Sequence, residues 1–274
     1  MAEIVGIFGV SHTPVMTNMP DAPGAAIRDA VFDAFRRVGK EIAALAPDSL
    51  LLVSNDHLHN FFIDNLPPFC IGAGDSYDSP LEGWLKVDRR EVPGDAAFGA
   101  HLIESAFDAG FDPAFSMELI LDHAMVTPLE LAGVAGAFPI VPIYVNCVQP
   151  PLPRMMRCFE FGRALRDGIE RYSGARRVAM LATGGLSHDV GTPRMGCINE
   201  DFDRRFLRLL DDGDPETLAR FLQVEVNTAG NGAEEVRNWL VAHGAAQNCK
   251  FELYHYQPVP EWYTGIGVGQ WTRR

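Results

Sequence analysis

The chain has 274 residues, enough for one large domain or two small ones, and its 47% hydrophobic and 22% charged residues are typical of a globular protein. The formal net charge of −13 disfavours a nucleic-acid partner, because phosphate-backbone binding rests on clustered Lys and Arg. No stretch approaches the roughly 20 apolar residues of a membrane span, and the N-terminus lacks the pattern of a signal peptide. We therefore expect a cytoplasmic protein that binds neither nucleic acid nor membrane.

Predicted strands and helices alternate along the chain. Short apolar runs predict strands at 3–10, 49–54, 140–146 and 177–182, and helical spacing of apolar residues predicts helices at 25–45, 97–109 and 159–172. Three further helices, at 199–210, 215–221 and 232–243, precede a closing strand at 250–256. This alternation predicts an α/β fold in one domain over 1–274, with a mostly parallel central sheet flanked by helices. The Pro-rich segment 149–153 is interpreted as a loop within it.

Three histidines follow predicted strands directly. His12 follows the first strand, His57 the second, and His188 ends the segment TGGLSH after the strand at 177–182. The carboxyl ends of parallel strands share one edge of a sheet, where ligands of open α/β folds bind. For a lone histidine a turn-capping role is the simpler interpretation, but three at one edge predict a shared site.

A fourth histidine, His123, lies between a predicted strand and a helix that Thr127-Pro128 could begin. Asp122 precedes it just as Asp56 precedes His57. Such carboxylates either orient imidazoles or cap turns, and the sequence leaves both roles open.

These histidines have no cysteine beside them, which favours a metal bound by nitrogen and oxygen ligands. The five cysteines are widely spaced without a CxxC pair, so we expect buried thiols rather than disulfides or a cysteine zinc site. A carboxylate ligand is available at the start of the helix predicted at 232–243, from Glu234 or Glu235. Glu235 shares a face with the apolar Trp239 and Ala242 and is the better candidate, although both glutamates suit a helix-dipole role.

Five motifs in order resemble a known family. SHTP, NDH followed by FF, DH followed by TPLE, GGLSH and GAEEVRNW cover almost the whole chain. Together they resemble the class III extradiol ring-cleavage dioxygenases, which include the protocatechuate-cleaving β subunit and the dihydroxyphenylpropionate enzymes. The ordered set is far more specific than any one motif.

The resemblance implies a site and a reaction. It implies Fe(II) bound by His12, His57 and Glu235, with His188 and His123 as acid and base groups, an α/β sandwich-like fold and no organic cofactor. The substrates would be a catechol and O2, with both oxygen atoms incorporated into the ring-opened product. The NDH register selects His57 over the neighbouring His59 as the ligand. Ala124 departs from the family pattern, in which we expect glycine after the Asp-His pair.

The substrate is less well defined by the sequence. The segment 193–206 resembles the protocatechuate-type enzymes, whereas 146–153 and 258–267 resemble the dihydroxyphenylpropionate type. Aromatic residues that could wall a pocket, or equally belong to the core, are Phe61, Phe62, Trp262 and Tyr263. Candidates to bind a substrate carboxylate are Arg154, Arg157 and Arg194.

Two other classes of function fit the same residues: a zinc hydrolase that activates water and a non-catalytic binding protein on this fold. Metal content and oxygen consumption discriminate between them and the dioxygenase. The resemblance further implies a homo-oligomer, and the protocatechuate enzymes use a small helical partner subunit, of which no fused segment is present here.

Overall fold

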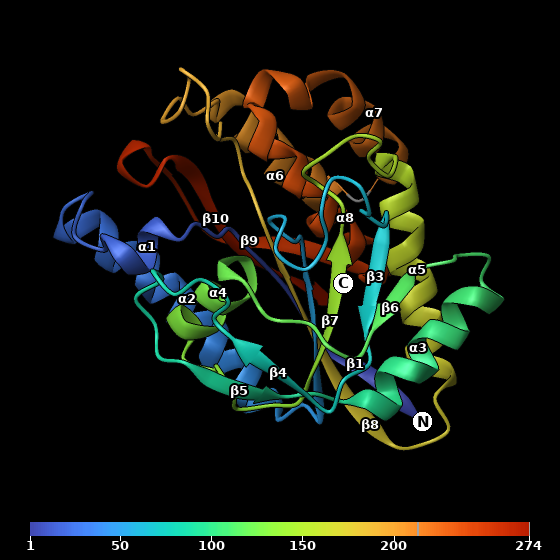
Figure 1. The fold of residues 1–274 in the computed structure, drawn as a ribbon. Coiled ribbons are helices and arrows are strands. Elements are labelled where there is room, and N and C mark those ends of the chain that lie inside the picture. Colours follow the sequence, from blue (N-terminus) through green and yellow to red (C-terminus); the bar gives the residue numbers. More distant parts are fainter. Residues whose placement is uncertain (213, 274) are drawn as a thin grey trace.

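Eight strands form one sheet at the centre of the computed structural model, which describes residues 1–212 and 214–273 (Figure 1). Their order is β6-β3-β7-β2-β8-β1-β10-β9. The strands are β1 (Ala2–Val10), β2 (Ser49–Ser54), β3 (Phe69–Gly72), β6 (Ala114–Ser116), β7 (Ile140–Val145), β8 (Arg176–Thr183), β9 (Cys249–Val259) and β10 (Thr264–Arg273). A separate pair is formed by β4 (Ser76–Ser79) and β5 (Arg90–Pro93). The predicted α/β fold with a mostly parallel sheet is therefore confirmed.

The four central strands, β7, β2, β8 and β1, pair in parallel. Each is a near-continuous apolar run, as expected of strands that are covered on both faces, and every residue of β2 is buried. Val10 of β1 pairs with Thr183 of β8, and Val53 of β2 pairs with Ala182. The chain consequently leaves these three strands at the same level of one sheet edge.

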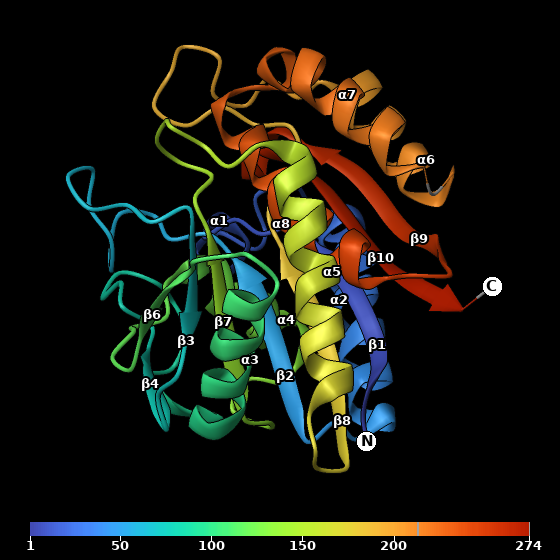
Figure 2. The same ribbon diagram turned by 90° about the vertical axis from the view of Figure 1, so that its right-hand side faces the viewer.

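Helices cover both faces of the sheet (Figure 2). On one face lie α2 (Ala25–Leu45) and α4 (His123–Ala132); on the other lie α3 (Ala96–Asp108), α5 (Met155–Arg171) and α8 (Val236–Ala245), with α6 (Glu200–Asp212) and α7 (Pro215–Glu225) beyond them. Shorter helical elements are α1 (Val15–Asn18), η1 (Val226–Ala229), η2 (Asn231–Glu235) and η3 (Pro260–Trp262). The buried apolar side chains accordingly form two clusters, one on each side of the sheet.

The helices of each layer pack closely through glycine. A Cβ on Gly39 of α2 would lie 1.7 Å from the carbonyl oxygen of Ala132 in α4, and one on Gly162 of α5 would lie 1.9 Å from that of Val241 in α8. Only glycine permits such a backbone approach. The helix α4, which carries a site histidine, is thus packed directly on α2.

The C-terminal part departs from the prediction of a single closing strand. The chain instead forms the antiparallel hairpin β9–β10, and β10 pairs with β1. Glycine stands at every second position early in β10, which is unusual within strands. A Cβ on Gly265 would lie 2.1 Å from the Asp203 carboxylate, and one on Gly267 would lie 3.0 Å from Leu186. These glycines make room for the segment that carries His188.

Two helices that carry site residues also differ from the prediction. The helix α4 begins at His123 rather than near Thr127, because Asp122 caps it by accepting a hydrogen bond from the amide of Ala124. Pro128 then lies inside the helix. The helix predicted at 232–243 is the 3-10 turn η2 followed by α8.

The cysteines are not all buried, contrary to the prediction. Cys70, Cys147 and Cys158 are buried, whereas Cys197 is exposed and Cys249 is half-buried. Burial raises the pKa of the Cys158 thiol to about 12, which keeps it protonated. Within 1–212 and 214–273, no helix is both long enough and apolar enough to cross a membrane.

Candidate metal centre

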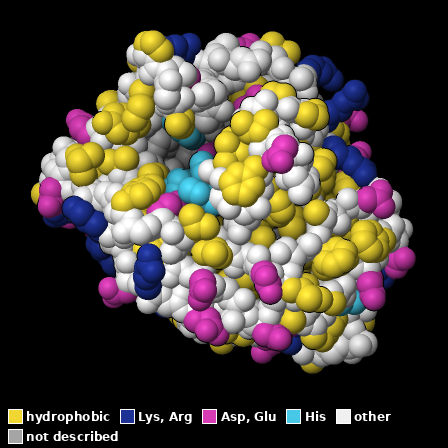
Figure 3. All heavy atoms as spheres, in the orientation of Figure 1, with side chains coloured by type: hydrophobic (Ala, Val, Ile, Leu, Met, Phe, Trp, Pro, Cys, Tyr) yellow, Lys and Arg dark blue, Asp and Glu magenta, His cyan; other side chains and the backbone are white. Residues whose placement is uncertain are grey.

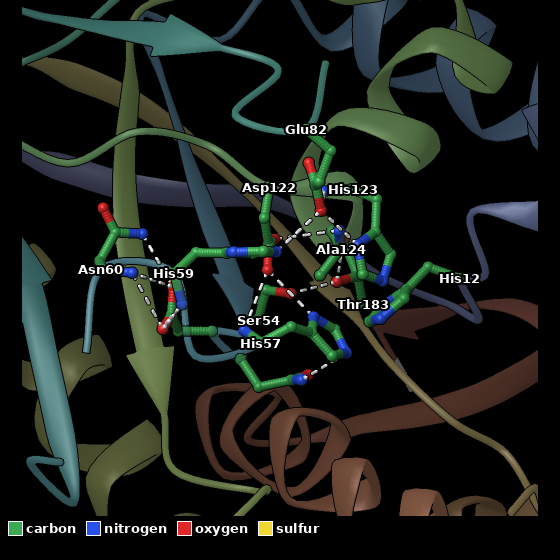
Figure 4. Close-up of polar contacts among 12 residues, drawn as sticks. His12, Ser54, His57, His59, Asn60, Glu82, Asp122, His123, Ala124 and Thr183 are labelled. Carbon is green, nitrogen blue, oxygen red and sulfur yellow. Dashed lines mark hydrogen bonds and ion pairs between the residues drawn. The ribbon is translucent and has the colours of Figure 1, made fainter. Parts of the chain in front are cut away.

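Three histidines meet near the carboxyl ends of the parallel strands. Figure 3 shows histidine side chains in a hollow on this face of the molecule. His12 follows β1, His57 follows β2 and His123 begins α4. The ring centroids lie 5.5 Å apart for His12 and His57, 5.7 Å for His12 and His123, and 4.2 Å for His57 and His123 (Figure 4). Each ring offers a nitrogen within 4.8 Å of the others, close enough for one metal ion. The predicted convergence of these residues is therefore present.

Glu235 joins this cluster from the last position of η2. Its Oε2 lies 3.6 Å from Nε2 of His12, and its Oε1 lies 3.3 Å from Nε2 of His57. Asn55 donates a hydrogen bond to the same Oε1 at 3.2 Å. Glu235 is buried, whereas Glu234 is half-buried and pairs with Arg237. The structure thus places the preferred glutamate at the histidines, even though α8 is buried all round rather than on one face.

The glycine pair of TGGLSH contacts Glu235 directly. The amide of Gly185 donates a hydrogen bond to Glu235 Oε2 at 2.6 Å, and a Cβ on Gly184 would lie 2.9 Å from that of Glu235. Both glycines have positive φ, 145° and 53°, which favours glycine at these positions. The pair therefore brings backbone against the carboxylate and redirects the chain toward His188.

His188 packs against η2, the turn that ends in Glu235. Its Nδ1 donates to the carbonyl oxygen of Leu186 at 3.0 Å, and a Cβ on Gly232 would lie 2.0 Å from its Nε2. The imidazole is half-buried, and its charge lowers the pKa of Glu235. The structure thus brings His188 near the cluster through Gly232 and Glu235.

Burial and charge set the protonation of the innermost groups. Burial lowers the pKa of His12 to about 3, and both its ring nitrogens are buried without a hydrogen-bond partner among the described residues. Burial alone would raise the pKa of Glu235, but His12 and His57 hold it well below its usual value. A neutral imidazole and an ionised carboxylate are the forms that bind a metal ion. The unpartnered His12 nitrogens fit such a ligand role.

Asp122 has both of the roles that the sequence left open. Its Oδ2 accepts from Nδ1 and from the backbone amide of His57, each at 3.0 Å, while Oδ1 caps α4 through Ala124. Burial would lower the pKa of His57, but hydrogen bonds to Asp122 and Glu235 raise it to about 10. Asp56 instead accepts only backbone amides and the side chain of Asn60, so it stabilises the turn after β2. The two Asp-His pairs are therefore not equivalent.

His59 lies apart from His12 and Glu235. Its Nε2 is 3.3 Å from Oε1 of Glu82, and the same oxygen accepts from Nδ1 of His123 at 2.6 Å. Glu82 stands in the loop between β4 and β5 and was not singled out from the sequence, because no motif or spacing marks it. His59, Glu82, Asp122 and His123 form a second group of possible metal ligands.

Two hydrogen-bonded links behind the cluster also escaped the sequence analysis. Ser54 at the end of β2 bonds to Thr183 at the end of β8, at 2.7 Å, and Thr183 donates to the carbonyl oxygen of Ala124 at 2.8 Å. Asp203 of α6 accepts from the amide and hydroxyl of Ser187, both at 2.8 Å, and from Tyr256 at 2.9 Å. Burial raises the pKa of Asp203 to about 6. These links fix the strand ends and the loop that carries His188.

The four aromatic candidates differ in their burial and contacts. Trp262 is fully buried and stacks on Phe32, so it belongs to the core. Phe61 packs edge-on against Tyr144, whereas Phe62 is exposed. Tyr263 is half-buried after η3.

The three arginine candidates also separate. Arg157 packs over the ring of Phe111 and donates to the carbonyl oxygen of Gly110, and Arg154 is exposed. Arg194 forms an ion pair with Asp189, at 3.2 Å, beside His188. Of the three, Arg194 is thus the one tied to the His188 loop.

Imidazoles and a carboxylate at the carboxyl edge of a mostly parallel sheet are typical of metal-binding proteins of the α/β class. Residues 6–267 match the family described as the catalytic LigB subunit of aromatic ring-opening dioxygenase. The chain belongs to this family and is an extradiol ring-cleaving enzyme, as the motifs predicted. Membership in this family of dioxygenases argues against the two alternatives, a zinc hydrolase and a non-catalytic binding protein.

Similar proteins cover the chain almost completely. A 2,3-dihydroxyphenylpropionate/2,3-dihydroxicinnamic acid 1,2-dioxygenase from Rhodococcus rhodochrous is 31% identical, over 94% of this chain and 95% of its own. One of the same name from Photorhabdus laumondii is 27% identical, over 96% of each chain. The crystal structure of an uncharacterized protein from Escherichia coli K12 has a TM-score of 0.65 at 17% identity, covering 97% of this chain and 98% of its own. That structure supports the fold alone.

Proposed function

We propose that the chain binds Fe(II) through His12, His57 and Glu235 and opens the ring of a catechol with O2. The observation that carries this proposal is the Glu235 carboxylate, which reaches Nε2 of both histidines, at 3.6 Å and 3.3 Å, from the buried turn η2. Two imidazoles and one carboxylate on one face of a metal are typical of non-haem Fe(II) oxygenases. Asp122 behind His57 supplies the orienting partner that such a ligand needs.

An alternative ligand set consists of His12, His57 and His123. Three neutral imidazoles would leave the buried Glu235 carboxylate uncoordinated beside the ion, although an anionic oxygen ligand binds a divalent ion more strongly than a neutral one. Glu235 is therefore the better third ligand, and His123 is left for proton transfer.

When bound, Fe(II) supplies open coordination positions and the redox chemistry that dioxygen requires. The residues of the chain bind and orient the substrate and move protons. We propose that His188 accepts a hydroxyl proton from the catechol, because histidine is the side chain that most often serves as a general base. The protonated His188 then donates a proton as the ring opens, and His123 assists proton transfer through its Nε2.

We propose a catechol with a carboxylated side chain as the substrate, of the dihydroxyphenylpropionate or protocatechuate type. The relatives named for dihydroxyphenylpropionate favour the first. Arg194, next to the His188 loop, is the arginine best placed to meet the carboxylate, provided that it leaves Asp189. We further propose that the enzyme is cytoplasmic and forms a homo-oligomer. Co-purification tests whether a small helical partner subunit binds to it.

The test is O2 uptake together with absorbance, after anaerobic loading with Fe(II), on protocatechuate, gallate, dihydroxyphenylpropionate and catechol. A yellow product formed with stoichiometric O2 uptake is expected, fastest with dihydroxyphenylpropionate. Zn(II)-loaded protein is the control and should take up no O2. Failure to bind Fe(II) would overturn the proposed cofactor.

A further inference from the structure

We propose that Glu82 is a positioning residue for His123: it holds the imidazole with the proton on Nδ1, so that Nε2 faces the reacting groups. This inference rests on the proposed role of His123. It concerns a residue outside the five family motifs, in the loop between β4 and β5. That loop contacts His123 through Glu82 and Trp84.

The two contacts between Glu82 and His123 determine both the position and the orientation of the ring. Oε1 of Glu82 accepts from the backbone amide of His123 at 3.1 Å and from its Nδ1 at 2.6 Å. Glu82 is 3% exposed, so solvent does not compete for this carboxylate. A short hydrogen bond to a buried carboxylate is among the stronger ones in proteins.

The segment that carries Glu82 is itself anchored next to Asp122. The amide of Leu81 donates to the carbonyl oxygen of Leu121 at 2.8 Å, and the amide of Leu85 donates to that of Glu82 at 3.2 Å. The ring centroid of Trp84, two residues after Glu82, lies 6.3 Å from that of the His123 ring. The loop therefore contacts the imidazole through both a carboxylate and an aromatic ring.

The tautomer follows from the acceptor. A neutral imidazole carries one N–H, and a carboxylate that accepts from Nδ1 places the proton there. The lone pair is then on Nε2. Figure 4 shows the ring of His123 between Glu82 and His12, so Nε2 is on the side of the metal centre. Asp122 orients His57 in the same way, through Nδ1 at 3.0 Å.

A second metal ion is the competing interpretation of His59, Glu82, Asp122 and His123. Both oxygens of Asp122 already accept hydrogen bonds, from His57 and from Ala124. The separation of 2.6 Å between His123 and Glu82 is moreover that of a hydrogen bond. These contacts therefore favour Glu82 as a positioning carboxylate rather than as a metal ligand.

The first test replaces Glu82 by methionine and by glutamine. E82M removes the acceptor at similar size and should lower kcat roughly 10- to 100-fold with little change in KM or iron content, as loss of an orienting partner does. E82Q retains an acceptor oxygen and should recover most of the activity. The matched control is E130M, which removes a carboxylate paired with Arg90 on the same helix α4 and should leave the kinetics unchanged.

A double-mutant cycle shows whether Glu82 acts through His123. E82M should cost nothing further in an H123A background. An equal loss in both backgrounds would overturn the proposal, as would loss of a second equivalent of bound metal in E82M.

A measurement independent of activity separates this inference from the proposed function. The ¹⁵N shifts of His123, assigned by difference from H123A, should report a proton on Nδ1 in the wild-type chain and a shift toward Nε2 protonation in E82M. If the wild type cleaves no catechol, the proposed function fails while these spectra still decide the tautomer. A proton on Nε2 in the wild type would contradict the role of Glu82.

Discussion

His57 and His123 occupy similar surroundings but differ in one contact. Each follows an aspartate, and each donates Nδ1–H to a buried carboxylate from another segment, Asp122 for His57 and Glu82 for His123. Nε2 of His57 also lies 3.3 Å from Glu235, whereas the carboxylate that contacts His123 is on its Nδ1 side. The same orienting contact is thus present at the proposed metal ligand, which also meets a second carboxylate, and at the proposed proton-transfer group, which does not.

The largest effect is expected from removing that second carboxylate. E235A should lose bound Fe(II) and fall to background activity, because two neutral imidazoles without an anion bind a divalent ion weakly. Metal analysis after desalting measures this directly. Iron retained at full stoichiometry in E235A would favour the set of three histidines instead.

Removing His123 should separate chemistry from metal binding. H123F should retain iron but lose roughly 10²- to 10⁴-fold in kcat, the usual contribution of a general acid or base. Iron content and steady-state kinetics on the same preparation measure the two effects. Loss of iron in H123F would erase the proposed difference between the two histidines.

A smaller effect is expected from Asp122. In D122N the side-chain oxygen can still cap α4 through Ala124, but the amide nitrogen then faces the N–H groups of His57. Iron affinity should fall about 10- to 100-fold, whereas E82M should leave it unchanged. Competitive titration with a chelator compares the two variants, and equal affinities would contradict the distinct roles of these carboxylates.

The smallest effect concerns stability. Burial raises the pKa of Asp203 to about 6, above the value near 3.9 of an unfolded aspartate. The Asp203 carboxyl group therefore binds its proton more tightly in the folded state than in the unfolded state. The free energy of unfolding of the wild type, relative to that of D203N, should decrease by roughly 1–3 kcal/mol from pH 4 to pH 7, as this proton is lost. Urea unfolding of both chains over this range measures the difference. A difference independent of pH would contradict the raised pKa.

The sequence predicted the central strands well because each is an uninterrupted apolar run bounded by polar residues. It missed β10, because alternating glycines are not typical of a strand. Two of these glycines are explained by the close approach of Asp203 and Leu186, which only the structure shows. It also missed the short strands β3 to β6, which have too few residues for a periodic pattern. Local patterns thus sufficed where burial alone determines the structure.

For the site, the position after a strand predicted that His12, His57 and His188 share one edge of the sheet. The structure brings His12 and His57 together with His123, while His188 packs against η2. The sequence favoured Glu235 because it shares an apolar helical face with Trp239 and Ala242. In the structure α8 is buried on all sides, and the amide of Gly185 donates a hydrogen bond to the carboxylate. Glu82 is 41 residues from its partner His123 in the chain. No periodicity encodes such a contact, so it became visible only in three dimensions.

The hydrophobic side chains form two separate clusters, one on each face of the sheet, and the metal centre lies on the seam between them. His123 belongs to the layer of α2 and α4, whereas Glu235 leads into α8 of the opposite layer. We expect a cavity opened beneath α4 to disturb His123 first, and one opened beneath α8 to disturb Glu235 first. Substitutions far from the pocket can therefore reach the two sides of the site from separate layers of the fold.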